Sequence, residues 1–407
     1  MTVQELRSQF PELSEKVYGK NLVYLDNAAT SQRPLSVVRK WTEMSTVINS
    51  NLHRAVHHLA NLATEEYENT RKFVADYIGA ARPEEIIFTS GTTNSVNLLA
   101  FSFGEAFVNA GDEILVSEAE HHSNIVPWQM LCQRKGASLK RIPVLDDGTL
   151  DLAVLSSFLT KKVKIVCVTH ISNVLGIINP VAEIVSICHG KGIPVFVDGA
   201  QGIVHADVDV SKLGCDFYAF SGHKIYAAPG TGILYGKSKW LEQLPPYMGG
   251  GEMIDTVKWS GTTYAKSPHR FEAGTQNISG VPTLVPALEL ASVTTSGDIQ
   301  ANLETVKEYV YDALMSRGDV RLFGNPVYKS LKVPLFSFCV DGVHHEDLAL
   351  ILDKMGVAVR SGQMCAEPLM DRFGETGMLR VSFAAYNTME EAEIFIRSLD
   401  RAVKMLR

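Results

Sequence analysis

The chain has 407 residues, of which 46% are hydrophobic and 20% are charged, and its formal net charge is −7. A chain of this length can bury a large core and has room for two domains. The acidic balance excludes the basic surface typical of proteins that bind nucleic acid or anionic membranes, and no apolar stretch reaches the length of a membrane span.

The N-terminal segment MTVQELRSQFPEL carries charges and lacks the apolar core of a secretory signal. It predicts a short amphipathic helix with Val3, Leu6 and Phe10 on one face. The six cysteines show neither a CxxC pair nor the spacing of a disulfide framework. We therefore expect a reducing, cytoplasmic environment.

Residues 22–30 predict a short strand that ends in a polar turn, and residues 37–47 predict a helix. Three histidines follow within residues 51–58 (NLHRAVHH). His53 and His57 are four positions apart and could share one helix face, as zinc ligands do. No third ligand or companion glutamate stands at metalloprotease spacing, so a structural role or a place in a substrate site is favoured over a metal site.

Strands and helices then alternate along the chain. Residues 85–102 predict a strand, a glycine turn and a helix. The turn Gly91-Thr92-Thr93 offers free backbone N–H groups, two hydroxyls and the positive end of a helix dipole, which suit one phosphate, although threonine there can also be a simple cap. Further elements continue the alternation in the manner of parallel βαβ units: strands at 139–144 and 164–170 and a helix at 181–189.

Two apolar runs, residues 195–197 and 217–220, are rich in the β-branched and aromatic residues typical of strands. In open α/β sheets ligands bind beyond the carboxyl ends of strands, so the polar residues that follow both runs are expected to face one crevice. These residues are Asp198, Gln201, Ser221, His223 and Lys224. Each charge alone would more simply be a surface charge or a turn former. Together they suit pyridoxal phosphate, which needs a lysine amine for its Schiff base and an acid for its pyridine nitrogen.

After residue 235 the pattern changes. Residues 245–263, with three consecutive glycines, predict a loop, which ends in RFEAGT, and residues 282–316 predict a long helix. This helix would link to a smaller α/β unit with strands at 333–340 and 379–384 and helices at 345–355 and 390–403. Within that unit, residues 358–369 predict a loop that carries Arg360 and Cys365.

The chain as a whole resembles the fold-type I pyridoxal-phosphate enzymes and, more narrowly, the group II (SufS-type) cysteine desulfurases of the class V aminotransferase family. The motifs that carry the resemblance stand in the family's order: LVYLDNAAT, NLHRAVHHL, FTSGTTNSVN, EAEHHSNIVPWQ, THISNVLG, VDGAQ, FSGHKIY, RFEAGT, VRSGQMCAEP and LRVSFAAYNT. The resemblance implies an α/β fold whose large domain, residues 22–285, has a mainly parallel sheet flanked by helices. Residues 1–21 and 286–407 would form a smaller domain that carries the nucleophile loop.

The resemblance also implies roles around the cofactor, pyridoxal 5'-phosphate. Lys224 would bind the cofactor and move protons at the substrate's α and β carbons, and Asp198 would pair with the pyridine nitrogen. His121 would stack on the ring, and Gln201 would hydrogen-bond its phenolic oxygen. The phosphate would be held by Thr92, Thr93, Ser221 and His223. A threonine that matches Thr275 reaches the phosphate from the partner subunit in this family, which implies an obligate homodimer.

For the substrate, the resemblance implies L-cysteine, with L-selenocysteine as an alternative. Arg380 would hold its carboxylate, and the remaining contacts would come from Asn173, which also reaches the cofactor, Arg360 and His53. Arg360 could equally be an electropositive anchor of its loop.

Cys365 would be the nucleophile, which takes the substrate's sulfur as a persulfide and leaves alanine. A loop position suits this role, because the thiol must approach the substrate and then present its sulfur outward. The polar run from Arg360 to Gln363 disfavours the alternative that Cys365 is a small apolar filler. The sulfur would pass to an acceptor protein of the SufE or SufU type for iron–sulfur cluster assembly.

The sequence departs from common group II patterns in three places. Gln363-Met364 replaces a frequent His-His, Ala227-Ala228-Pro229 replaces a Gly-Pro-Thr-like run, and Gln276 replaces a usual proline. None removes a group that the chemistry requires, but the first leaves the identity of the acceptor protein open.

Alternatives with the same fold are a selenocysteine lyase and a cysteine sulfinate desulfinase. Cys365 favours the desulfurase over both and over a plain aminotransferase, which has no use for such a thiol. A catalytically silent relative would be expected to lack Lys224 or Asp198, and both are present.

Overall fold

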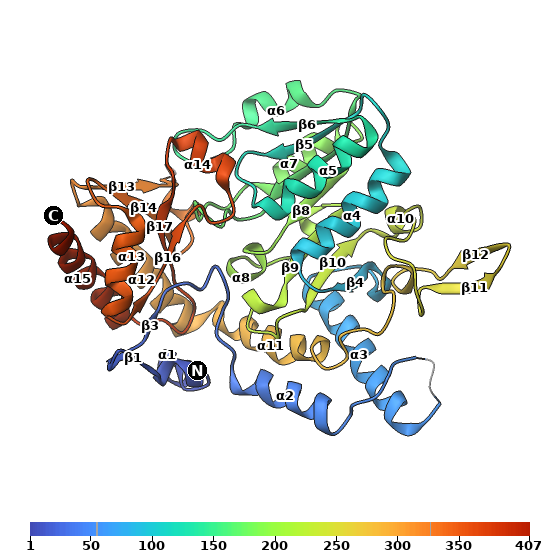
Figure 1. Ribbon diagram of the computed structural model, residues 1–407, viewed down its shortest axis with the longest axis horizontal. Helices are drawn as coiled ribbons and strands as arrows, with labels where there is room; N and C mark the ends of the chain where they lie inside the picture. Colours follow the sequence, from blue (N-terminus) through green and yellow to red (C-terminus); the bar gives the residue numbers. More distant parts are fainter. Residues whose placement is uncertain (54–55, 326) are drawn as a thin grey trace.

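The computed structural model describes residues 1–53, 56–325 and 327–407. Its centre is a seven-stranded sheet with the strand order β4-β10-β9-β8-β7-β5-β6 (Figure 1). Strands β5 to β9 pair in parallel, and β10 runs antiparallel to both β4 and β9. The predicted, mainly parallel sheet is therefore present. Its strands are β4 Ile86–Thr89, β5 Glu113–Ser117, β6 Ser138–Ile142, β7 Val163–Thr169, β8 Val195–Asp198, β9 Phe217–Ser221 and β10 Gly232–Gly236.

Helices cover both faces of this sheet, because alternate side chains of each strand point to opposite faces. Ile165 and Phe196 pack with α4 and α5 on one face, whereas Val166 and Val197 pack with α3, α7 and α11 on the other. The helices around the sheet are α2 Leu35–Thr46, α3 His58–Tyr77, α4 Thr92–Phe107, α5 Val126–Lys135, α6 Leu152–Phe158, α7 Val181–His189, α8 Gly202–His205, α9 Val210–Leu213, α10 Ser238–Leu241 and α11 Leu284–Thr294.

A second, antiparallel sheet with the strand order β13-β14-β17-β16 lies at the C-terminal end of the chain (Figure 1). It packs with three helices around its own apolar core. The N-terminal segment joins this part, because β3 Val23–Tyr24 pairs in parallel with β15 Val357–Ala358. The other elements here are β13 Val320–Phe323, β14 Leu335–Val340, β16 Arg360–Gly362, β17 Met378–Ser382, α12 Gly297–Met315, α13 His345–Lys354 and α15 Met389–Leu406.

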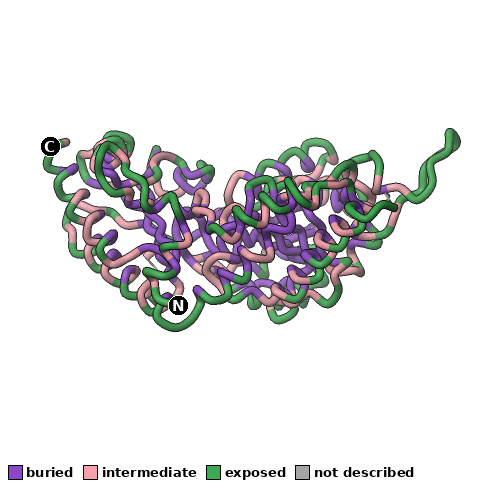
Figure 2. The backbone as a smooth tube through the Cα atoms, turned by 90° about the horizontal axis from the view of Figure 1, so that it is seen from below, coloured by how far each residue is buried: buried purple, intermediate pink, exposed green. Residues whose placement is uncertain are grey.

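Three sequence-based expectations about elements are wrong. The predicted loop at 245–263 contains a hairpin of β11 Ile254–Lys258 and β12 Gly261–Tyr264, which projects from the molecule and is exposed along its length (Figures 1 and 2). The single helix predicted at 282–316 is two helices, α11 and α12, which are separated where Gly297 adopts a φ of 63°. The N-terminal helix, α1 Val3–Arg7, ends before Phe10, which is nevertheless buried.

Buried residues run through the middle of the molecule (Figure 2). Among the described residues, no helix is both long enough and apolar enough to cross a membrane.

Candidate active site

The carboxyl ends of β8 and β9 open onto a cavity of about 220 Å³. The structure brings most of the sequence-predicted site residues to its walls: Thr92, Thr93, His121, Asn173, Asp198, Gln201, Ser221, His223, Lys224, Arg360, Cys365 and Arg380. They come from both halves of the chain, so the cavity lies where the two sheets meet.

Lys224 and Asp198 are the charged groups that follow β9 and β8. Asp198 is buried and accepts a hydrogen bond from the backbone N–H of Ala200 at 2.9 Å. Burial raises the pKa of Asp198, partly offset by that hydrogen bond and by the charge of Lys224, and burial lowers the pKa of Lys224. Neither side chain forms an ion pair with a described residue. A buried acid and a buried amine that form no ion pair with a described residue fit a ligand that offers a basic ring nitrogen and an aldehyde.

His121 follows β5 and caps the short helix that begins at His122. Its Nδ1 accepts a hydrogen bond from the backbone N–H of Ser123 at 3.0 Å, which places the ring proton on Nε2. Burial, followed by the charge of Lys224, lowers the pKa of His121 to about 3. His121 therefore presents a neutral imidazole to the cavity.

An anion site is formed where α4 begins. The backbone N–H of Thr92 donates to Ser221 Oγ at 2.8 Å, which ties the start of this helix to the end of β9. Gly91 has a φ of 146°, and a Cβ on Gly232 would lie 2.3 Å from the α carbon of Gly91, so the turn packs directly on β10. Backbone N–H groups and hydroxyls at the positive end of a 16-residue helix are suited to a phosphate.

Two further polar residues face the cavity near this turn. Gln201 donates from Nε2 to the carbonyl of Ala28 at 2.8 Å, which leaves its second amide hydrogen for a ligand. His223 Nδ1 lies 3.2 Å from Thr30 Oγ1. Burial, followed by the charges of Lys224 and Arg33, lowers the pKa of His223 to about 4, so this ring is also neutral.

Arg380 supplies a buried cation opposite these groups. It is 3% exposed and lies on β17, where it donates from Nη1 to the carbonyl of Asn173 at 2.9 Å and from Nη2 to Asp26 Oδ1 at 3.0 Å. Its Nε is buried without a partner among the described residues. Arg360 on β16 is half-exposed, with Nη1 3.8 Å from Asp26 Oδ2. Arg360 and Arg380 together carry one positive charge more than Asp26 neutralises, so this side of the cavity suits an anionic substrate group.

The nucleophile loop is shorter than predicted, because residues 358–369 include β16 and the start of α14 Glu367–Phe373. Cys365 is exposed and lines the cavity, whereas the other five cysteines are buried or half-buried. Met364 and Cys365 have φ values of 53° and 55°. Their carbonyl oxygens accept hydrogen bonds from Asn173 Nδ2 at 2.9 Å and from the backbone N–H of His122 at 2.7 Å.

His53 does not line this cavity. It precedes α3, which begins at His58, so the expectation that His53 and His57 share a helix face is wrong. Arg54, in the same motif, lies outside the described residues. Thr275 is an exposed loop residue and is also absent from the cavity walls of its own chain.

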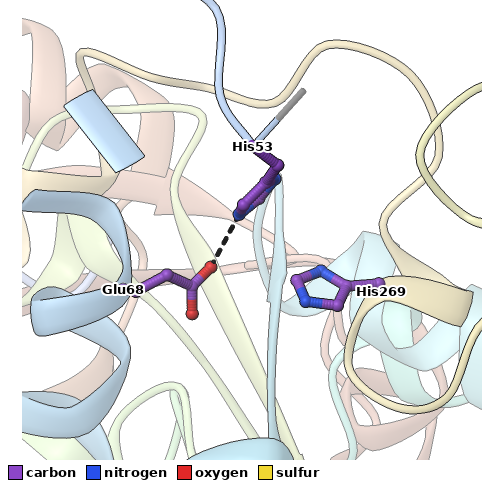
Figure 3. Close-up of side chains that lie close together, drawn as sticks. All are labelled: His53, Glu68 and His269. Atoms are coloured by element: carbon purple, nitrogen blue, oxygen red, sulfur yellow. Dashed lines mark hydrogen bonds and ion pairs between the residues drawn. The ribbon is translucent and has the colours of Figure 1, made fainter. Parts of the chain in front are cut away.

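His53, Glu68 and His269 instead form a cluster whose potential ligand atoms lie within 4.8 Å of one another (Figure 3). His53 Nε2 is 3.0 Å from Glu68 Oε1, and Arg71 donates to both oxygens of Glu68. Burial would raise the pKa of Glu68, but the hydrogen bonds from His53 and Arg71 outweigh it and lower this pKa to about 2. Because Arg71 already occupies the carboxylate, we interpret the cluster as an ion-pair network.

Several residues of the site were missed by the sequence reasoning. Asp26 and Ala28 belong to the motif LVYLDNAAT, which predicts a strand and a turn and carries part of the family resemblance but gives neither residue a role in the site. Glu120 is fully buried and accepts hydrogen bonds from Asn124, Ser117 and the backbone N–H of Thr169, a residue of the cavity wall. Burial raises the pKa of Glu120 to about 8. Further wall residues without a predicted role are Ala29, Ser123, Thr169, Ile171, Ala200 and Met364.

Comparison with known proteins gives concordant matches. Residues 23–395 match the model of the family "Aminotransferase class-V". A protein of Escherichia coli O127:H6 named cysteine desulfurase is 44% identical over 407 residues, which cover 100% of this chain and 99% of the relative.

Two solved structures have the same fold over the whole chain. The crystal structure of the cysteine desulfurase CsdA from Escherichia coli, with 37% identity and a TM-score of 0.90, covers 100% of both chains. The apo structure of a cysteine desulfurase from Thermococcus onnurineus NA1 also has 37% identity, with a TM-score of 0.93, and covers 100% of this chain and 99% of its own.

Proposed function

The chain belongs to the class-V aminotransferase family, and from this premise we propose that it is a pyridoxal-phosphate-dependent cysteine desulfurase that converts L-cysteine to L-alanine. One observation carries the proposal: Cys365, the one exposed cysteine among the described residues, lines the same cavity as Lys224, Asp198 and Arg380. An enzyme that only transferred amino groups would not need a thiol at this place.

The polar residues of the cavity support specific contacts with the cofactor. Lys224 would bind pyridoxal phosphate covalently, Asp198 would hold its ring nitrogen, and the start of α4 with Ser221 would hold its phosphate. When bound, the cofactor supplies an electron sink that weakens bonds at the α and β carbons of an amino acid.

The chain's own residues then direct the reaction. Arg380 holds the substrate's carboxylate in a planar, bidentate geometry. The Lys224 amine, whose pKa burial lowers, gives and takes the proton at the α carbon. The Cys365 thiolate attacks the substrate's sulfur, so that an S–S bond forms as the C–S bond breaks. The electron pair of the broken bond stays with the β carbon, which takes a proton, for which Lys224 is the proposed donor, and alanine leaves.

We also propose a homodimer, with Thr275 completing the phosphate site of the other subunit. The exposed position of Thr275, away from the cavity of its own chain, supports this. The exposed Cys365 supports transfer of the persulfide sulfur to an acceptor protein of the SufE or SufU type for iron–sulfur cluster assembly. The six unpaired cysteines support a cytoplasmic location. A large domain at 22–285 and a small one formed by 1–21 and 286–407 complete the proposal.

The decisive experiment compares the parent protein with Cys365→Ala and Lys224→Ala after incubation with L-cysteine. Alanine and protein-bound persulfide should form in the parent, and both should be lost in Cys365→Ala although the cofactor's absorbance remains. Lys224→Ala should lose that absorbance band. Cys339→Ala, which removes a half-buried thiol elsewhere, should behave like the parent. Undiminished alanine formation in Cys365→Ala would overturn the proposal in favour of a lyase that needs no protein nucleophile.

A further inference from the structure

His122 makes two contacts with the nucleophile loop that the proposed chemistry does not use. Its backbone N–H donates to the carbonyl oxygen of Cys365 at 2.7 Å, and its ring Nε2 accepts the backbone N–H of Glu367 at 2.9 Å. These contacts bracket Ala366, which is buried. His122 alone therefore holds the backbone on both sides of Ala366, the residue that follows Cys365.

The loop needs such fixing because its backbone conformation is unfavourable. Met364 and Cys365 are consecutive non-glycine residues in the left-handed region, where each L-residue costs on the order of 1–2 kcal/mol. A short loop in this conformation persists only when its surroundings hold it. Asn173 donates a hydrogen bond to the carbonyl of Met364. His122 forms the next two hydrogen bonds along the chain, with the carbonyl of Cys365 and the backbone N–H of Glu367.

His122 also connects the loop to the cofactor side of the cavity. It follows His121 directly, and His121 is fixed by Ser123 through the ring and faces the cavity. The ring of His121 and the hydrogen bond to the carbonyl of Cys365 therefore belong to adjacent residues.

We propose that His122 is the positioning residue that holds Cys365 in its sulfur-accepting geometry, an inference that rests on the proposed desulfurase function. Release of its two hydrogen bonds lets residues 363–366 relax outward. The first half of the reaction, sulfur uptake from the substrate, requires the held geometry. The second half, delivery to an external thiol, does not.

The test uses His122→Ala and His122→Gln in the cofactor-loaded enzyme. Glutamine is neutral and keeps an acceptor for the Glu367 N–H. The matched control is His344→Ala, because His344 Nδ1 likewise accepts a helix-start N–H, from Glu346 at 3.3 Å, but lies outside the cavity. Cofactor absorbance confirms that each variant is folded and loaded.

The first measurement is alkylation of Cys365 by iodoacetamide without L-cysteine, followed by mass spectrometry of its peptide. Loss of the ring hydrogen bond should raise this rate in His122→Ala roughly three- to tenfold, as expected for one net hydrogen bond. His122→Gln should return most of the way to the parent rate, and His344→Ala should match the parent. Parent-like alkylation in His122→Ala, or an equal rise in His344→Ala, would overturn the proposal.

The second measurement is alanine formation with excess dithiothreitol as the sulfur acceptor. In His122→Ala, kcat should fall about tenfold or less while KM for L-cysteine changes less, because a positioning defect acts on the attack and not on carboxylate binding. A rise in KM with unchanged kcat would overturn the positioning role. If even the parent formed no alanine, the proposed function would fail, but the alkylation rates would still decide whether His122 holds the loop.

Discussion

Asp26 Oδ1 lies 3.0 Å from Arg380 Nη2, while Asp26 Oδ2 lies 3.8 Å from Arg360 Nη1, so one carboxylate orients both arginines of the cavity. Arg380 is almost fully buried, and its guanidinium plane is set by Asp26 on one side and by the carbonyl of Asn173 on the other. In the proposed role of Arg380, the substrate's carboxylate would meet that plane edge-on for two parallel hydrogen bonds.

We therefore expect Asp26→Ala to raise KM for L-cysteine about tenfold, because a charge-assisted hydrogen bond that orients the clamp is lost. The change in kcat should be smaller. A matched control is Asp312→Ala, which removes the exposed partner of Lys329 and should leave both constants unchanged. A lower KM in Asp26→Ala would show that the freed charge of Arg380 matters more than its orientation.

Gly91→Ala should weaken binding of pyridoxal phosphate. The φ of 146° disfavours an L side chain, and the new Cβ would lie 3.3 Å from Ser221 Oγ at the anion site. Titration of the apo protein with the cofactor should show an affinity lower by about tenfold or more. Gly111→Ala is a matched control, because Gly111 also has a positive φ, of 84°, but a Cβ there would have no atom within 4 Å. It should affect stability without affecting cofactor affinity, and an equal loss of affinity would contradict the role of the turn.

The ring of His121 should remain neutral down to about pH 5. Its folded pKa of about 3 lies below the ordinary value of 6.5, so the unfolded chain binds the proton first. The contribution of this group to stability is therefore complete above about pH 6.5 and is lost as the pH falls toward 3. An NMR titration of ¹⁵N-histidine-labelled protein should show no change at His121 between pH 8 and about pH 5. A midpoint near 6.5 would contradict the buried, Ser123-bound geometry.

Glu272→Ala should destabilise the fold strongly. Arg71 and Glu272 are both buried and pair at 2.7 Å and 2.9 Å, and Glu272 also accepts the backbone N–H of Phe88 on β4. Removal of Glu272 takes away one of the two carboxylates that pair with the buried Arg71 and leaves Glu68 as the other. Loss of these charged hydrogen bonds should cost about 2 kcal/mol or more. The midpoint of urea unfolding should fall clearly, whereas Asp312→Ala at the surface should change it little. Equal midpoints for the two variants would show that Glu68 alone compensates the charge of Arg71.

The residues at the strand ends could be predicted because local sequence fixes their places. The apolar runs before Asp198 and Lys224 are true strands of one parallel sheet, so both groups had to reach the same edge. The hairpin at Ile254–Tyr264 could not be predicted by alternation, because both of its faces are exposed and no side chain is selected for burial. Likewise, the break before Gly297 separates two segments that both have helical sequences, so the pattern alone predicts one continuous helix.

The residues that hold the site residues in place could not be predicted from the sequence, for a different reason. Asp26, His122 and Asn173 act through contacts with residues 191 to 354 positions away, which no local pattern encodes. The left-handed conformation of Met364 and Cys365 is equally hidden, since neither residue type favours it.

Asn173 holds the carbonyl of Met364 with its side chain and the guanidinium of Arg380 with its own carbonyl. In the proposed mechanism, the nucleophile Cys365 and the carboxylate-binding Arg380 therefore share Asn173 as a common support. A redesign for a larger amino acid that displaced Arg380 would also disturb the hydrogen bond that Asn173 makes with the loop of Cys365. New specificities on this scaffold will require compensating changes in two distant stretches of the chain at once.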